Sequence, residues 1–133
     1  MKTGDCVKIK RGVKDPYFNN YDLSSWQGRI INLQYRIPDI IAIPQEIISV
    51  EIELDSVTLM NLPVKYIYDC IQMGCDFSVI IVDPYAFDQV QARDTRSRVK
   101  SVRHKLSQKY DFAFYLDDEE TIDELIHLEM PWN

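Results

Sequence analysis

The apolar residues change their spacing at Pro63, and this change constrains the fold more than any other feature of the sequence. Before it, they alternate with polar residues, most regularly from Ile48 to Leu54, as expected for a strand with one buried face. After it, they recur at intervals of three and four residues, as in Val64, Ile67 and Ile71, which is typical of a helix. We therefore predict an α+β fold with strands in the first half and a mainly helical second half.

The first half predicts a small, strongly bent β-barrel over residues 1–62, since four or five short strands remove their open edges by closing. Strands are expected at 7–9, 29–33 and 48–54. Gly28 is expected to open the second of them, where a side chain would collide with the neighbouring backbone or with Trp26. The stretch 35–47 contains two prolines and predicts an edge strand or a hairpin loop. The apolar phase slips after Asp55, and this predicts a bulge or a sharp bend.

The second half, residues 63–133, predicts a helical part packed on the barrel, so that the chain forms one compact unit. Proline or a capping residue marks each expected helix start, and Gly74 supplies a stop for the first helix. The run 79–82 is too short to assign to a strand or a buried turn, and 112–116 is a candidate strand. The helix starts are expected at Pro63, Asp83-Pro84, Asp94 or Thr95, and Asp117.

The amino-acid composition disfavours several classes of protein. The chain of 133 residues is 46% apolar and 27% charged, with a net charge of −6, which disfavours a generally basic nucleic-acid binder. No apolar run reaches the length of about 20 residues that a membrane helix needs, and the N-terminus lacks a signal-peptide pattern. Three cysteines, an odd number, do not indicate a secreted disulfide framework. We predict a cytoplasmic protein without a membrane partner and without a cofactor; the oligomeric state stays open.

Short motifs in the first half resemble the small barrels of KOW and Tudor-like domains, which belong to the Src-homology-3-like class. The motifs are a Gly-Asp that opens the first strand, a turn glycine, and a second glycine followed by a basic residue and aliphatics. Longer pieces are similar to an uncharacterised bacterial family built on such a barrel. The resemblance implies a binding role for the barrel. It rests on Gly4–Ile9, Gly12, Gly28–Ile31, Asp15-Pro16, Trp26–Ile30 and Asp55–Leu59.

A long loop rich in aromatic residues follows the first strand and predicts a surface that grips a protein or peptide partner. The alternative is that its large rings, Tyr21 and Trp26 above all, fold back and close the open end of the barrel. The interaction module is the leading hypothesis. The residues assigned to partner binding are Tyr17, Phe18, Tyr21, Trp26, Gln27 and Arg29.

Basic residues support a second hypothesis, nucleic-acid binding by the barrel together with the helix expected at 93–109. That segment has seven Lys or Arg against one acidic residue, Asp94. The segment 111–133 that follows has eight acidic residues and no Lys or Arg, so an intramolecular pairing would equally neutralise the helix. We favour the intramolecular pairing. The residues assigned to nucleic acid are Lys8, Lys10, Arg96, Lys100 and Arg103.

Metal binding and catalysis find little support. The loop oxygens of Asp15, Asn19, Asn20 and Asp22 do not follow a calcium-loop pattern, and solvated turns account for them. Cys70 and Cys75 lack zinc-like partners, because neither His104 nor His127 lies in a ligand motif; burial of Cys70 is the simpler reading. Asp55, Ser56 and Thr58 offer a carboxylate and hydroxyls without a nearby histidine. We predict a protein without a metal and without enzymatic activity, although an enzyme or an enzyme-regulating subunit stays a third hypothesis.

Overall fold

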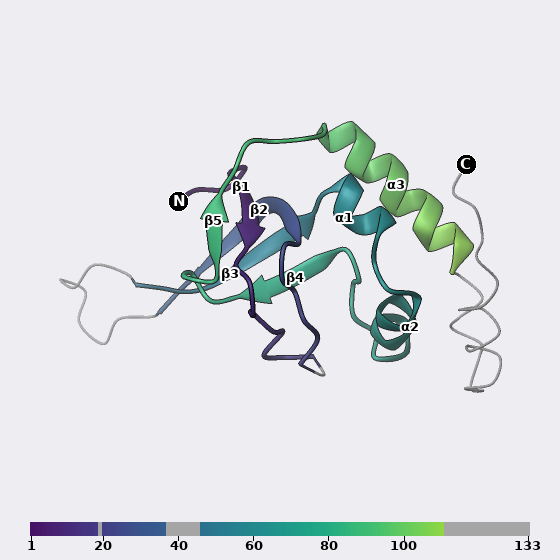
Figure 1. The fold of residues 1–133 in the computed structure, drawn as a ribbon, viewed down its shortest axis with the longest axis horizontal. Coiled ribbons are helices and arrows are strands. Elements are labelled where there is room, and N and C mark those ends of the chain that lie inside the picture. Colours follow the sequence, from purple (N-terminus) through teal and green to yellow (C-terminus); the bar gives the residue numbers. More distant parts are fainter. Residues whose placement is uncertain (19, 37–45, 111–133) are drawn as a thin grey trace.

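The computed structural model describes residues 1–18, 20–36 and 46–110, and the statements below refer to these. Three strands are followed by two helices, two further strands and a last helix, and the strands form one sheet with helices packed around it (Figure 1). The elements are β1 (Cys6–Ile9), β2 (Gln27–Tyr35), β3 (Ile47–Leu54), α1 (Ser56–Met60), α2 (Val64–Gln72), β4 (Val79–Val82), β5 (Phe87–Gln89) and α3 (Arg96–Lys109).

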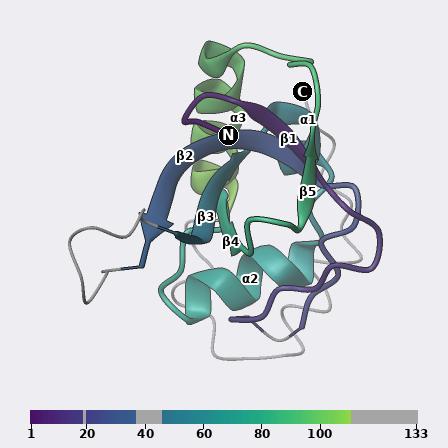
Figure 2. The same ribbon diagram turned by 90° about the vertical axis from the view of Figure 1, so that its left-hand side faces the viewer.

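All five strands pair in an antiparallel sheet of order β4-β3-β2-β1-β5, which confirms an α+β fold. The predicted closed barrel is not confirmed, because β4 and β5 form the two edges of the sheet and do not pair with each other. Only residues 83–86 connect these two edge strands, and β2 curves strongly across the sheet (Figure 2). A register shift between Ile30 and Asn32 accompanies this curvature, as a bulge increases local twist and bend.

The second half supplies two strands, which corrects the helix expected to start at Asp83-Pro84. These residues begin a tight turn in which the Ala86 N–H donates to the Asp83 carbonyl at 3.1 Å. The chain then enters β5, where Phe87 lies opposite Ile9 of β1. Pairing with a strand almost eighty residues away decides this segment, and local periodicity carries no information about such a partner. The unassigned run 79–82 is β4.

Alternation in β3 is confirmed for Val50, Ile52 and Leu54, which are at most 1% exposed. It is wrong for Ile48, which is 44% exposed. A second register shift between β2 and β3, at Gln34, interrupts the alternation near this end of the strand. Figure 1 shows that this end of β3 extends away from the labelled helices.

The phase change after Asp55 marks neither a bulge nor a bend within a strand but the start of α1. Asp55 is the N-cap, and its carboxylate accepts the Thr58 N–H at 2.9 Å. The helices predicted at Pro63 and at Thr95 are confirmed as α2 and α3. Among the described residues, no helix combines the length and apolarity that crossing a membrane requires.

One hydrophobic core joins both halves of the chain. Sheet residues such as Val7 and Ile52 share it with Ile67 of α2 and with Val102 of α3. The short helix α1 packs against α3, and α2 lies below both of them in the two views (Figures 1 and 2). The strand expected at 112–116, the helix expected at Asp117, and most of the stretch 35–47 lie outside the described residues.

Candidate functional site

A pocket of about 270 Å³ opens between the aromatic loop, helix α2 and strand β4. The loop forms one wall with Tyr17 and Phe18, and Tyr66 of α2 adds a third ring. Tyr17 is 69% exposed at this wall, whereas Tyr66 is 2% exposed. The remaining lining residues are Asp15, Cys70, Cys75, Asp76, Val79, Ile80 and Ile81. Aromatic and aliphatic side chains thus dominate a concave surface, as in most binding pockets of proteins.

Some aromatic rings of the loop pack against helix α2, and one is largely exposed to solvent. Phe18, Tyr21 and Trp26 surround Tyr66, with ring centroids 5.9, 4.9 and 5.1 Å from it. The Tyr21 hydroxyl donates to Asp69 on the same helix. Three of the four predicted rings therefore pack on α2. The alternative expected such rings to close the open end of a barrel, and a closed barrel is not confirmed. Tyr17 is the ring that remains largely exposed at the pocket.

Two aspartate side chains of the loop accept hydrogen bonds from backbone N–H groups of the same loop. Asp15 Oδ1 accepts the Tyr17 N–H at 2.9 Å, and Asp22 Oδ1 accepts the Ser24 N–H at 2.9 Å. These are Asx-type turns, in which an aspartate bonds to the backbone two residues ahead. The turns fix the wall of the pocket, and Asn20 adopts a left-handed φ of 51° between them. Asn19 lies outside the described residues.

The pocket is acidic. Asp15 is 6% exposed, and its burial raises the pKa of its carboxyl above the usual range, against the effect of its backbone hydrogen bonds. Asp76 is exposed, and its Oδ1 accepts the Ser78 N–H at 2.9 Å. None of the described residues that line the pocket is basic. The pocket therefore presents negative charge beside an apolar floor.

Two thiols also line the pocket, with different properties. Burial raises the pKa of Cys70 to about 12, so its thiol stays protonated and unreactive at neutral pH. Cys75 is exposed. Within the described part of the chain, no group of three or more His, Cys, Asp or Glu residues is placed to hold a metal ion.

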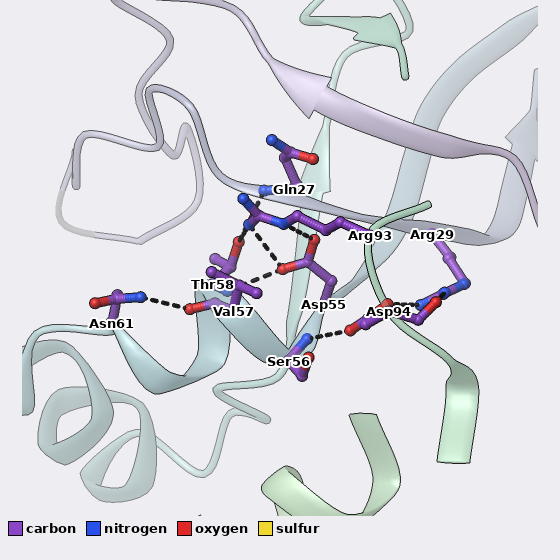
Figure 3. A network of polar contacts seen from close by, with 9 residues as sticks. All are labelled: Gln27, Arg29, Asp55, Ser56, Val57, Thr58, Asn61, Arg93 and Asp94. Carbon is purple, nitrogen blue, oxygen red and sulfur yellow. Dashed lines mark hydrogen bonds and ion pairs between the residues drawn. The ribbon is translucent and has the colours of Figure 1, made fainter. Parts of the chain in front are cut away.

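A separate polar network holds the N-terminus of α1 and the segment before α3 against the sheet (Figure 3). Arg29 of β2 forms an ion pair with Asp94 at 2.8 Å, and the other Asp94 oxygen accepts the Ser56 N–H at 2.6 Å. Burial alone would raise the pKa of Asp94, but the Ser56 and Arg29 hydrogen bonds outweigh it and lower this pKa. The Arg29 side chain is only 11% exposed. This predicted partner-binding residue is thus engaged inside the fold.

The second part of the network is centred on Asp55, whose side chain is 6% exposed. Arg93 donates to both of its oxygens, at 2.7 and 3.0 Å, and the same guanidinium reaches the Thr58 hydroxyl at 3.0 Å. The Asp55 hydrogen bonds raise the pKa of Arg93. The Gln27 N–H donates to the Thr58 hydroxyl at 3.1 Å. The Asp55 carboxylate and the Thr58 hydroxyl, which were candidates for catalysis, are therefore engaged in structural hydrogen bonds. They hold the first turn of α1, Arg93 and the Gln27 backbone together.

The basic residues of the second hypothesis lie in two places. Lys8 is exposed on β1, and Lys10, directly after this strand, is exposed and approaches Asp88 at 3.9 Å. On α3, Arg96 and Lys100 are exposed. Arg103 reaches Glu53 of β3 at 3.4 Å, so one basic residue of α3 is engaged with the sheet. The acidic segment 111–133 lies outside the described residues.

Sequence reasoning found one wall of the pocket and missed the other. Tyr66 follows the helical spacing of α2 and could have been noted as an aromatic on its inner face. Asp76 and strand β4 had no local signal, because only the sheet pairing brings them beside the loop. The sequence predicts Arg93 and Asp94 as part of a basic helical segment, whereas both precede α3: Asp94 pairs with Arg29 of β2, and Arg93 pairs with Asp55, the N-cap of α1.

Comparison with known proteins adds no relative: no family model, no curated protein and no solved structure matches the chain. The function is therefore inferred from the pocket, from the exposed charges and from the physical chemistry of both. Of the two candidate surfaces, the pocket combines shape, aromatic rings and a defined charge. The basic face of α3 offers charge alone.

Proposed function

We propose that the protein is a non-enzymatic interaction module that binds a peptide segment of a partner protein at the pocket beside Tyr17. One observation carries the proposal: a fixed aromatic loop, a helix and a strand edge enclose an apolar cavity of about 270 Å³. Large rings at such a cavity supply most of the energy in peptide recognition. The resemblance of the first half to KOW and Tudor-like small barrels supports a binding role in the same direction.

Tyr17 is the residue whose replacement tests this function with the least disturbance of the fold. Its side chain is exposed, so Tyr17→Ala removes contact area without opening the core. Tyr85 is a matched control, because it is 81% exposed and does not line this pocket. Both variants remove the same atoms, one at the pocket and one away from it.

The experiment selects binders from a random peptide library on the immobilised wild-type protein and measures their affinities by fluorescence anisotropy. We expect Tyr17→Ala to weaken them by about ten-fold or more, the loss typical of a central aromatic contact. Tyr85→Ala should leave the affinities within about two-fold, as for a residue outside the interface. Equal affinities for the wild type and Tyr17→Ala would contradict the proposal.

A chemical block gives an independent readout. Cys75 is exposed and lines the pocket, so a fluorescein maleimide coupled to it should fill the entrance. Peptide binding should then be lost, and the Cys75→Ser variant treated with the same reagent should retain it. Binding that survives a stoichiometric label on Cys75 would place the peptide elsewhere.

Nucleic-acid binding is the second candidate function, and the exposed cations of α3 favour it. Arg96, Arg98, Lys100 and Lys105 are exposed, and α3 contains no acidic residue. Retention of RNA and DNA measured at low salt and again at about 200 mM would test it, since phosphate binding falls steeply over this range. No retention at low salt would exclude the function, whereas steep salt-dependent retention lost in Lys100→Glu would support it.

A further inference from the structure

The edge of strand β4 is open beside the pocket. Among the described strands, β4 pairs only with β3, and Ile52 lies opposite Ile80. The Leu54 N–H donates to the Ser78 carbonyl at 2.8 Å, so Ser78, Ile80 and Val82 belong to the hydrogen-bonded set of this antiparallel ladder. The alternate residue Ile81 therefore directs its N–H and carbonyl away from β3. Within the described residues, no further strand pairs with this edge.

The pocket lies directly along this edge. Val79, Ile80 and Ile81 line it on the strand side, and the rings of Tyr17 and Phe18 line it on the loop side. A chain laid along β4 would place alternate side chains on the same face, at a spacing of two residues. One apolar side chain of such a chain can enter the pocket while its backbone pairs with Ile81. An open edge and an adjacent pocket are the two elements of recognition by strand addition.

Charge determines which peptide fits. Asp15 and Asp76 are acidic members of the pocket wall, and the lining that the structure describes contains no basic residue. Asp76 uses Oδ1 for Ser78, and no hydrogen bond to its Oδ2 occurs within the described residues. The whole chain carries a net charge of −6. A basic segment is therefore attracted and an acidic one repelled.

We propose that the partner segment is a basic, extended peptide that adds a strand to the open edge of β4, places one apolar side chain in the pocket, and carries Lys or Arg two residues from that anchor, next to Asp76. The proposal rests on the function given above and adds to it the conformation and the chemistry of the ligand. Backbone pairing with β4 supplies affinity, the pocket selects the anchor, and the carboxylates select the flanking charge.

The first arm of the test uses seven-residue peptide pools with fixed positions. The anchor is fixed as Leu or as Asp, and the residue two positions away is fixed as Arg or as Glu. We expect retention of the Leu–Arg pool to exceed that of the Asp–Arg pool by about ten-fold, as for loss of a buried apolar anchor. The Leu–Arg pool should also exceed the Leu–Glu pool, and Asp76→Asn should reduce this second preference by about two- to five-fold.

The second arm leaves the protein unchanged and alters the peptide backbone. In an added strand, every second amide of the peptide faces β4 and the others face solvent. A selected peptide is N-methylated on one set of alternate amides or on the other, so that each peptide is the control for its partner. We expect one set to abolish binding, by about ten-fold or more, and the other to change it by less than about three-fold.

Each outcome separates the two proposals. Binding that both methylated peptides retain would overturn strand addition, and equal retention of the Arg and Glu pools would overturn the basic ligand. In either case, loss of binding in Tyr17→Ala would leave the proposed function intact. If no pool is retained by the wild type, both proposals fail. Preference for Leu–Arg together with one inactive methylated peptide supports the inference.

Discussion

Gly28 occupies a place in the sheet where no side chain fits. A Cβ at this position would lie 2.1 Å from the Glu53 carbonyl oxygen and 2.7 Å from Cγ2 of Ile52. Glu53 and Ile52 belong to β3, and Val7 of β1 pairs with Gly28 on its other side. The glycine is thus enclosed between two strands, and any side chain must push β3 away. The expected collision with neighbouring backbone at this position is confirmed, with β3 as the backbone concerned.

The size of the effect follows from these distances. Overpacking typically costs about 1–3 kcal/mol, and the collision here is with backbone, which cannot rotate out of the way as a side chain does. Separation of β2 from β3 would also weaken ladder hydrogen bonds that contribute about 1 kcal/mol each. We therefore expect Gly28→Ala to lower the free energy of unfolding by about 3–5 kcal/mol. A protein of this size has about 5–15 kcal/mol in total.

Gly12 provides the matched control. It has a positive φ of 84°, and a Cβ built there meets nothing within 4 Å. The left-handed backbone costs an alanine about 1–2 kcal/mol, whereas the reduced freedom of the unfolded chain returns about 0.4–1 kcal/mol. Gly12→Ala should therefore lower the free energy of unfolding by about 0–1.6 kcal/mol.

Urea unfolding followed by circular dichroism measures both variants against the wild type, with equal m-values as the condition for comparing their stabilities. A loss in Gly28→Ala no larger than that in Gly12→Ala would refute the reasoning, because it would mean that the β2–β3 spacing adjusts without cost. A variant that is unfolded in water would agree with the upper end of the expected loss.

Three further predictions concern the core, the thiols and the ion pair between Arg93 and Asp55. In urea unfolding, Ile52→Ala should cost about 2–5 kcal/mol, because Ile52 is 1% exposed, whereas the exposed Ile48→Ala should cost less than about 1 kcal/mol. Under iodoacetamide at pH 8, followed by mass spectrometry, Cys75 should react about 100-fold faster than Cys70, whose buried thiol has a pKa of about 12; equal rates would contradict its burial. Arg93→Met should lower the free energy of unfolding by about 1–3 kcal/mol, because the buried carboxylate that caps α1 loses its cation; unchanged stability would show that this ion pair contributes nothing.

Much of the candidate site was accessible from local sequence. Turn formers around Asp15 and the aromatics from Tyr17 to Trp26 predicted a fixed aromatic loop, and the loop forms one wall of the pocket. The sequence did not show which of these rings would pack on α2 and which would be exposed. This depends on Tyr66, because the rings that contact this side chain are partly buried against α2, whereas Tyr17 is 69% exposed.

The sequence by itself determined the features that depend on neighbouring residues. Alternation located β3, a capping signal at Asp94 or Thr95 located the start of α3 to within one residue, and proline and glycine bounded α2, because each signal acts over a few neighbouring residues. Only the tertiary structure decided where strands pair. The segment after Asp83 became β5 because β1 offers it an edge, and β4 came to lie beside the aromatic loop through its pairing with β3. Pairing over such separations is a property of the whole sheet, since hydrogen bonds between distant strands leave no periodicity in either one.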